Sequence, residues 1–495
     1  MKMPGEADGV GMDVPAGTTR GTKRPGTARR GLRGVTGALM SSLLLSGCLG
    51  LRGPEASAGS DRWIDPRSLP SSDSRAVAEL WPLHKIDTPE LLLPNGLDEA
   101  DVDADGLPDY VTNYEWSGRI RVAFHPEPGA ERRPWPAATV GRVSNAESVA
   151  FGDFDGDGRP DIAVAHGREV LFGSPGVRIL WGPPPSRARD PAAWRNGGDL
   201  PASRGGGHYH YIKTRDLTGD GRPDIVVGGR VGRVPAGLRW FEAPGDAVPA
   251  RKLKNWKLHV IDPELESGHG FVFGDLDGDG DEDIALANSD WDTFDADERV
   301  LWYENPGPAA PGQSEPWPKH ELYRGPEFYT KEQVDIGDLD GDGRMDLVVQ
   351  TIRDVLWFRN LGGSPVRWER IAIPKDPAAQ WRARPIRIVD LDGDGRREIL
   401  GMLIHWNGWL PADKAACFVM RFRGFAAGRD NWETRVLKWG DGFRGLGAFN
   451  GEKWDQLLFR DVDDDGDVDI VANCEEYHRG SSVLLAVVWF ENPRQ

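Results

Sequence analysis

Short apolar runs separated by turn residues recur along the chain from about residue 80 onward. Runs such as GFVFG before Asp275 and DIALAN from Asp283 have strand length and are rich in Val, Ile and Phe. A third run follows, as in VLWYENPG and VVWFENP, and a fourth usually begins with Trp, as at Trp256 and Trp317. The pattern predicts a repeating unit of four short strands.

A nine-residue pattern, D-x-D-x-D-G-x-x-D, lies between the first and second strands of every repeat. It occurs seven times, with Thr218 in place of one Asp and Glu398 closing the sixth copy. The side chains at positions 1, 3, 5 and 9 are Asp101, Asp103, Asp105 and Asp109; Asp153, Asp155, Asp157 and Asp161; Asp216, Thr218, Asp220 and Asp224; Asp275, Asp277, Asp279 and Asp283; Asp338, Asp340, Asp342 and Asp346; Asp390, Asp392, Asp394 and Glu398; and Asp461, Asp463, Asp465 and Asp469.

This spacing suits a hard cation. Carboxylates at positions 1, 3 and 5 of a tight loop converge on one point, Gly at position 6 permits the sharp turn, and position 9 closes the shell. Oxygen ligands in a flexible loop favour Ca²⁺, while Mg²⁺ is the weaker alternative because it keeps its waters. We therefore expect up to seven Ca²⁺ ions per chain, which would offset much of the formal net charge of −18.

Seven repeats of four strands predict an all-β fold, a seven-bladed β-propeller of four-stranded blades. The last repeat ends after its third strand, at VVWFENPRQ. A spare fourth strand, Trp81–Asp87 (WPLHKID), lies at the start and matches Trp256–Asp262 (WKLHVID). We expect this N-terminal strand to complete the last blade and close the ring, which removes open sheet edges.

The repeated loops and strands resemble the FG-GAP/VCBS-repeat proteins, whose extracellular calcium propellers include the integrin α-subunit head. The resemblance covers roughly residues 79–495, and the FG dipeptide survives as Phe151-Gly152 and Phe273-Gly274. It implies that the Asp and Glu positions given above are calcium ligands, one for one. Thr218 departs from the pattern, so the Asp216 loop is expected to be the weakest site.

Residues 1–48 have the features of an export leader. A basic segment, residues 20–34, precedes an apolar stretch too short to span a bilayer. The segment Leu45-Ser46-Gly47-Cys48 resembles the bacterial lipobox, which implies lipidation of Cys48 and a lipid anchor at the outer membrane or cell surface. An ordinary signal peptide cleaved nearby is the alternative. Residues 49–78 are rich in Gly, Ser, Pro and charge, which predicts a flexible tether, and residues 79–495 form the propeller.

Composition restricts the partners. The net charge of −18 disfavours nucleic acid, whose phosphates need clustered cations. The 20 Trp residues are mostly periodic, which indicates packing residues. Cys417 and Cys474 either pair in an oxidising compartment or remain two buried thiols.

A second candidate site lies six residues before each first Asp, about 20 Å away at roughly 3.3 Å per residue. All seven residues there are polar, whereas those two positions later are apolar, which predicts a polar ring at one mouth of the central channel. The seven polar residues are Asn95, Glu147, His210, His269, Glu332, Arg384 and Asp455. Exposure of the innermost strand ends to water is sufficient to explain such a ring without any binding function. Alternatively, two His and two Glu from it could hold a second divalent metal of the Zn²⁺ type, with Arg384 as a further ligand contact.

The chain shows no nucleophile elbow, phosphate loop or HExxH motif. The leading expectation is a non-enzymatic surface binding or adhesion module for glycan or protein ligands. Aromatic and charged residues after the second strands, among them Trp116 and His166, support a carbohydrate surface at the same mouth. The alternative is a carbohydrate-active enzyme, a lyase or dehydratase, with its site at that mouth.

Overall fold

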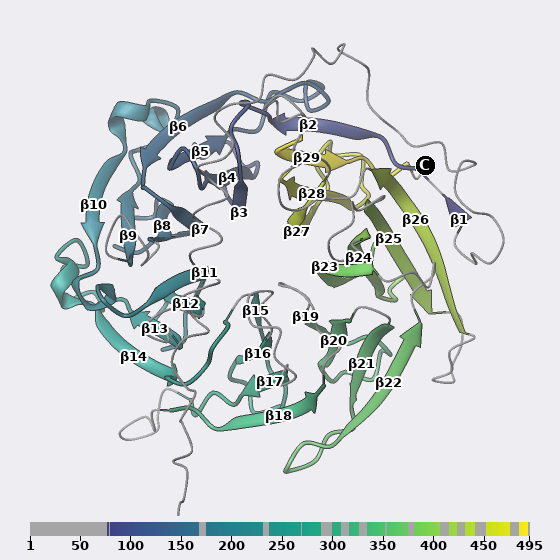
Figure 1. Cartoon of the computed structure of the whole chain (residues 1–495). Helices are drawn as coiled ribbons and strands as arrows, with labels where there is room; N and C mark the ends of the chain where they lie inside the picture. Colours follow the sequence, from purple (N-terminus) through teal and green to yellow (C-terminus); the bar gives the residue numbers. More distant parts are fainter. Residues whose placement is uncertain are drawn as a thin grey trace, which may run out of the picture.

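The computed structural model describes residues 77–78, 80–167, 175–230, 237–268, 270–288, 299–307, 316–325, 334–351, 354–374, 381–405, 415–422, 431–440, 452–475 and 485–493. Strands form seven sheets arranged as blades around a common axis (Figure 1). The predicted all-β, seven-bladed propeller is therefore confirmed.

Each blade follows chain order from the axis outward. Blade 1 contains β3 (Pro94–Ala100), β4 (Asp109–Tyr114), β5 (Arg119–Ala123) and β6 (Ala137–Arg142). Blade 2 contains β7 (Ala146–Gly152), β8 (Asp161–His166), β9 (Gly176–Trp181) and β10 (Arg195–Asp199). Blade 3 contains β11 (His208–Arg215), β12 (Asp224–Arg230), β13 (Leu238–Glu242) and β14 (Lys257–Asp262). Blades 4 and 5 contain β15 (Phe271–Gly274), β16 (Asp283–Asn288), β17 (Arg299–Tyr303) and β18 (Lys319–Arg324); and β19 (Val334–Gly337), β20 (Asp346–Gln350), β21 (Asp354–Asn360) and β22 (Trp368–Pro374). Blade 6 contains β23 (Trp381–Val389), β24 (Glu398–His405), β25 (Ala415–Phe422) and β26 (Trp432–Gly440).

Blade 7 joins the two ends of the chain. Its inner strands are β27 (Trp454–Arg460), β28 (Asp469–Cys474) and β29 (Val487–Phe490), and its outer strand is the N-terminal β2 (Leu83–Asp87). The pairing is antiparallel, with Leu83 opposite Phe490 and His84 opposite Trp489. The expected closure of the ring by the N-terminal strand is confirmed.

A further short strand, β1 (Val77–Ala78), pairs in parallel with β26, so blade 6 has a fifth strand. These two residues are the last of the segment expected to be a tether. The chain therefore contacts the outer edge of blade 6 before it enters blade 7.

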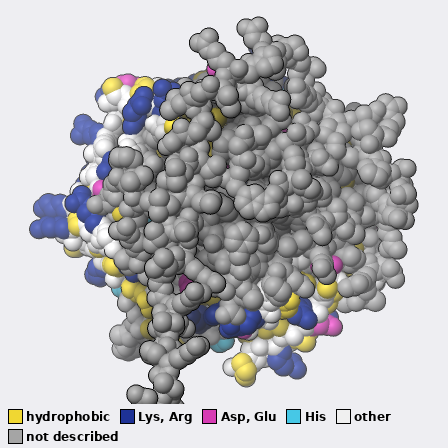
Figure 2. Space-filling model, in the orientation of Figure 1, with side chains coloured by type: hydrophobic (Ala, Val, Ile, Leu, Met, Phe, Trp, Pro, Cys, Tyr) yellow, Lys and Arg dark blue, Asp and Glu magenta, His cyan; other side chains and the backbone are white. Residues whose placement is uncertain are grey.

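Burial follows the position of each strand within its blade. The second strands β4, β8 and β28 are buried along their whole length, because each lies between two strands and between two neighbouring blades. The Trp residues at the start of the fourth strands are packing residues, as expected: Trp81, Trp135, Trp194, Trp256 and Trp317 are all buried. Figure 2 shows Lys and Arg side chains gathered along the rim beside β10.

Cys417 and Cys474 are both buried thiols, not a disulfide. Among the described residues no helix has the length and apolarity needed to cross a membrane.

Candidate metal loops and a buried histidine cluster

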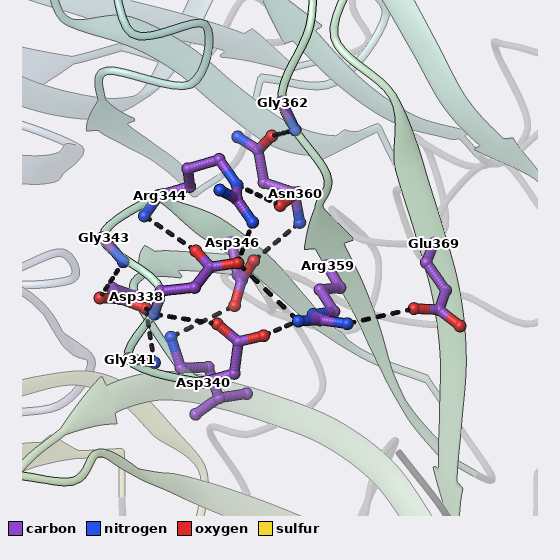
Figure 3. Close-up of polar contacts among 12 residues, drawn as sticks. Asp338, Asp340, Gly341, Gly343, Arg344, Asp346, Arg359, Asn360, Gly362 and Glu369 are labelled. Carbon is purple, nitrogen blue, oxygen red and sulfur yellow. Dashed lines mark hydrogen bonds and ion pairs between the residues drawn. The ribbon is translucent and has the colours of Figure 1, made fainter. Parts of the chain in front are cut away.

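The seven D-x-D-x-D-G-x-x-D segments, called the Asp loops, connect the first and second strands of the blades and so share one face of the ring. Figure 3 shows the loop of blade 5. Asp338 Oδ1 accepts hydrogen bonds from the backbone N–H of Gly341 (2.8 Å) and Asp342 (3.0 Å), and its Oδ2 accepts one from Gly343 (2.9 Å). Gly343 has a φ of 85°, a conformation that favours glycine, and the position-6 glycine has positive φ in all seven loops.

The position-9 carboxylate fastens each loop to its own blade. In blade 5, Asp346 Oδ1 accepts from the N–H of Asn360 at the end of β21 (2.7 Å), and Oδ2 accepts from Leu339 (3.2 Å). Burial raises the pKa of Asp346 to about 7, against the opposing effect of the backbone hydrogen bonds. Burial likewise raises the pKa of Asp109, Asp283, Glu398 and Asp469 to about 7, and that of Asp161 and Asp224 to about 8.

Carboxylate oxygens from three positions of a loop converge. In at least five of the seven loops, three acidic side chains place one oxygen each within 4.8 Å of one another. In blade 3, Thr218 Oγ1 instead donates to Asp216 Oδ1 over 3.3 Å. Close carboxylates repel one another unless a cation lies between them, and hard oxygen donors fit Ca²⁺. The residues present therefore fit calcium.

Contacts from the following blade reach the Asp loops, which sequence reasoning did not foresee. A residue at the end of the third strand, or two positions past it, contacts the position-2 carbonyl of the preceding blade's loop with its side chain: His125 Nε2 to Val462 O (3.0 Å), Asn360 Nδ2 to Leu276 O (2.8 Å) and Asn492 Nδ2 to Leu391 O (3.1 Å). An arginine between the third and fourth strands forms an ion pair with the position-3 carboxylate of the preceding blade's loop: Arg132 with Asp463 (2.5 Å), Arg189 with Asp103 (2.8 Å) and Arg251 with Asp155. An Asn recurs near the end of the third strand in three of the seven repeats, at Asn305, Asn360 and Asn492, and this was the signal available in the sequence.

Four residues of the expected polar ring lie toward the opposite ends of the innermost strands β3, β7, β11 and β27, on the side called here the distal face. The four residues of the ring whose side chains are described, Asn95, Glu147, His210 and Asp455, are buried. The apolar residues two positions later are buried as well, from Leu97 (0% exposed) to Leu457 (1%). His269 and Glu332 lie outside the described residues, and Arg384 is described only as part of the β23 backbone.

A β-bulge accompanies these polar residues. The register with the second strand shifts between Ala146 and Ser148, between Tyr209 and Tyr211, and between Trp454 and Gln456. Glu147, His210 and Asp455 are therefore the extra residues of their bulges. A bulge aims its side chain away from the regular alternation of a strand and is common beside functional sites.

Blades 2 and 3 bring a carboxylate and two imidazoles together on this side. Glu147 Oε1 lies 3.0 Å from His208 Nε2, and Glu147 Oε2 lies 3.5 Å from His210 Nε2. The two imidazole rings are 5.6 Å apart, centroid to centroid. Of this cluster, the sequence singled out Glu147 and His210 but missed His208, although the H-Y-H spacing was visible.

Several solved structures resemble the chain. One is BBS1N in complex with ARL6DN (12% identity, 84% of this chain and 98% of that chain, TM-score 0.43), and another is the Dos1 propeller (7%, 83% and 94%, 0.42). A third is the pyranose dehydrogenase PQQ domain from Coprinopsis cinerea (12%, 84% and 98%, 0.40). At these identities and TM-scores the similarities carry no inference about function. Curated proteins gave no significant match.

A sequence model of the FG-GAP-like repeat matches residues 101–164, 216–286, 275–349 and 338–401. Together these segments make up half of the chain. Each matched segment begins at the first Asp of an Asp loop, and the strands that follow form the blades described above. The chain therefore belongs to the FG-GAP-like repeat proteins.

Proposed function

We propose that the protein is a calcium-stabilised propeller outside the cytoplasm whose distal face binds a glycan or protein ligand. The Asp loops occupy one face and serve stability, which leaves the distal face for recognition. Binding sites of rigid scaffolds are commonly built from their loops and strand ends.

The observation that carries this proposal is an exposed Trp. Trp116 is 55% exposed, the most exposed of the large hydrophobic side chains that the structure describes. It lies in the turn between β4 and β5, at the distal end of blade 1. Most of the other Trp side chains that the structure describes are buried in the core, so packing does not explain Trp116. A flat aromatic with one polar group suits stacking against a sugar ring or a partner side chain.

A glycan array with Ca²⁺ present tests the proposal. Trp116→Ala should lower the signal of a retained glycan at least tenfold. Leu361→Ala is the matched control, because Leu361 is exposed (36%) but follows β21 on the Asp-loop face. If both variants retain the glycan equally, Trp116 is not part of the binding site. If no glycan is retained, the same pair of variants is compared for adhesion to protein-coated surfaces, and no difference there ends the proposal.

Catalysis on carbohydrate is the second candidate. The buried cluster of Glu147, His208 and His210 offers a base and a carboxylate at 3.0 Å, which a lyase or dehydratase could use. A rise in ultraviolet absorbance from an unsaturated product, on incubation with polysaccharide, would favour this function over binding alone.

Export and anchoring belong to the same proposal. Cys48 and the leader lie outside the described residues, so their support is the lipobox-like sequence Leu45-Ser46-Gly47-Cys48. Lipidation there would tether the propeller through residues 49–78, whose last two residues, Val77 and Ala78, pair with blade 6. Retention at the outer membrane is expected because Gly50 stands two residues after Cys48, where an Asp would resemble an inner-membrane retention signal.

A further inference from the structure

The cluster of Glu147, His208 and His210 has the composition of a transition-metal site. The glutamate comes from β7 in blade 2 and both histidines from β11 in blade 3, the innermost strands of adjacent blades. All three side chains are buried: Glu147 is 1% exposed, His208 7% and His210 5%. Two imidazoles and one carboxylate are the ligand set of an open zinc site, in which water or a substrate takes the fourth position.

The distances also fit such a site. Zn–N and Zn–O bonds of about 2.0–2.1 Å at tetrahedral angles place neighbouring ligand atoms about 3.3 Å apart. The two histidine Nε2 atoms lie 3.0 and 3.5 Å from the two oxygens of Glu147. Each histidine therefore contacts a different oxygen of one carboxylate, as two ligands flanking a carboxylate at a shared metal would.

The local backbone holds these side chains in place. Glu147 and His210 are the extra residues of two β-bulges, and Tyr209 between the histidines is buried in the core. Both imidazoles contact the Glu147 carboxylate across the junction of the two blades, at 3.0 Å from His208 and 3.5 Å from His210. Rigid strands with locked rotamers are the supports on which precise metal sites depend.

We propose that Glu147, His208 and His210 bind one divalent transition metal, Zn²⁺ being the ion whose ligand preference they match. This site is separate from the Asp loops, since Glu147 and Asp153 are at opposite ends of the same strand. Imidazole nitrogen selects against Ca²⁺, which prefers oxygen donors. The inference rests on this geometry and not on the ligand proposed for the distal face.

Zinc binding to the calcium-saturated protein tests the proposal. Titration with Zn²⁺ against a chromogenic chelator should reveal one tight site per chain. His208→Ala and Glu147→Gln should each weaken it by more than about 100-fold, beyond the 10- to 100-fold typical of residues that only support a ligand. His259→Ala is the matched control. His259 Nε2 also contacts a carboxylate, Glu242 at 2.8 Å, but on the outer strand of blade 3 and with no second histidine there among the residues described.

A second measurement does not depend on variants. Co²⁺ bound to the unaltered protein should give the intense visible absorption of a four- or five-coordinate ion, and Zn²⁺ should abolish it. Unchanged zinc affinity in both variants would overturn the proposal, as would a weak six-coordinate cobalt spectrum. In either case the cluster is a hydrogen-bonded junction between two blades. A glycan signal that survives while zinc binding fails would leave the proposed function standing.

Discussion

The guanidinium of Arg189 lies 2.8 Å from Oδ2 of Asp103, and this contact joins two blades. Arg189 follows β9 in blade 2, whereas Asp103 is the third position of the Asp loop in blade 1. The junctions of blades 7 and 1 and of blades 2 and 3 carry the same contact. The Asp loops are thus joints between blades as well as turns within them.

Replacing Arg189 should have different effects with and without calcium. Without metal, the arginine is a cation beside the Asp101 loop, so Arg189→Ala should lower the melting temperature. With calcium bound, the ion supplies that charge and the loss should be smaller. Because the Arg189 side chain is 51% exposed, we expect less than about 1 kcal/mol. Arg187→Ala is the control, since its partner, Asp190, lies in the same turn. If Arg189→Ala lowers the melting temperature equally in chelator and in calcium, the arginine does not substitute for the charge of the metal.

Chelation should destabilise the whole propeller. Metal that binds only the folded state stabilises it by about 2.7 kcal/mol per site at 100-fold excess over Kd. Several Asp loops could then supply a large share of the roughly 5–15 kcal/mol typical of a domain. Thermal melting with and without a chelator, together with metal analysis, measures this. A melting curve that a chelator leaves unmoved, in a protein without bound calcium, would contradict the proposal.

Two substitutions separate the loops. Asp277→Ala removes a carboxylate from a group that converges in blade 4, while Thr218→Ala removes only a hydroxyl in blade 3. The first should lower the melting temperature in calcium more than the second. In chelator the two variants should differ little, because the metal contribution is then absent from both.

Acidity should change the stability of the metal-free protein. Burial raises the pKa of Asp161 and Asp224 to about 8, far above the ordinary value near 4, so the folded state binds protons that the unfolded state has lost. That contribution to stability is present at low pH and is lost as the pH rises from about 4 to about 8. In chelator, melting should therefore be lower at about pH 8 than at about pH 5.5.

Calcium should reduce or reverse this trend, because it binds the ionised carboxylates and its affinity rises through the same window. Calorimetry in two buffers of different ionisation enthalpy should detect proton release on calcium binding. No proton release near pH 7 would mean that the position-9 acids are ionised without the metal.

Loss of β2 should open the ring. A chain beginning at residue 90 loses the buried Trp81 and Ile86, the pairing with β29 and the 2.7 Å contact between His84 and Glu491. Burial of two such apolar side chains alone contributes about 3 kcal/mol or more. A chain beginning at residue 79 is the control, because it also lacks residues 1–78 with β1 but keeps β2. If both melt alike, the outer strand of blade 7 does not close the ring in solution.

Cys48→Ala should release the protein from membranes. Lipidation needs the Cys48 thiol, so the variant should lose incorporation of labelled fatty acid and move to the soluble fraction after cell breakage. Ser46→Thr, which leaves the thiol in place, is the control. Unchanged fractionation of Cys48→Ala would mean that the leader does not make a lipoprotein.

Local patterns were enough to predict the propeller. The strand runs and the spacing of the Asp loops depend on residues close in sequence, where periodicity and turn geometry act directly. The match of Trp81–Asp87 to Trp256–Asp262 is a repeat that can be seen by comparing the two segments. The sevenfold repetition strengthened the prediction of a propeller, because each blade can bury its apolar faces only against neighbouring blades of the same kind. Ring closure followed, since one unpaired fourth strand stood at the start of the chain.

Local sequence patterns could not predict the side-chain contacts between blades. Arg189 and Asp103 are 86 residues apart, and nothing in either segment indicates the other. Glu147 and His210 meet as the extra residues of bulges in adjacent innermost strands, and a bulge depends on the register between strands. The sequence thus specifies which residues form each blade and each loop. The packing of one blade against the next sets which side chains meet, because that choice depends on distances across the ring that no local pattern encodes.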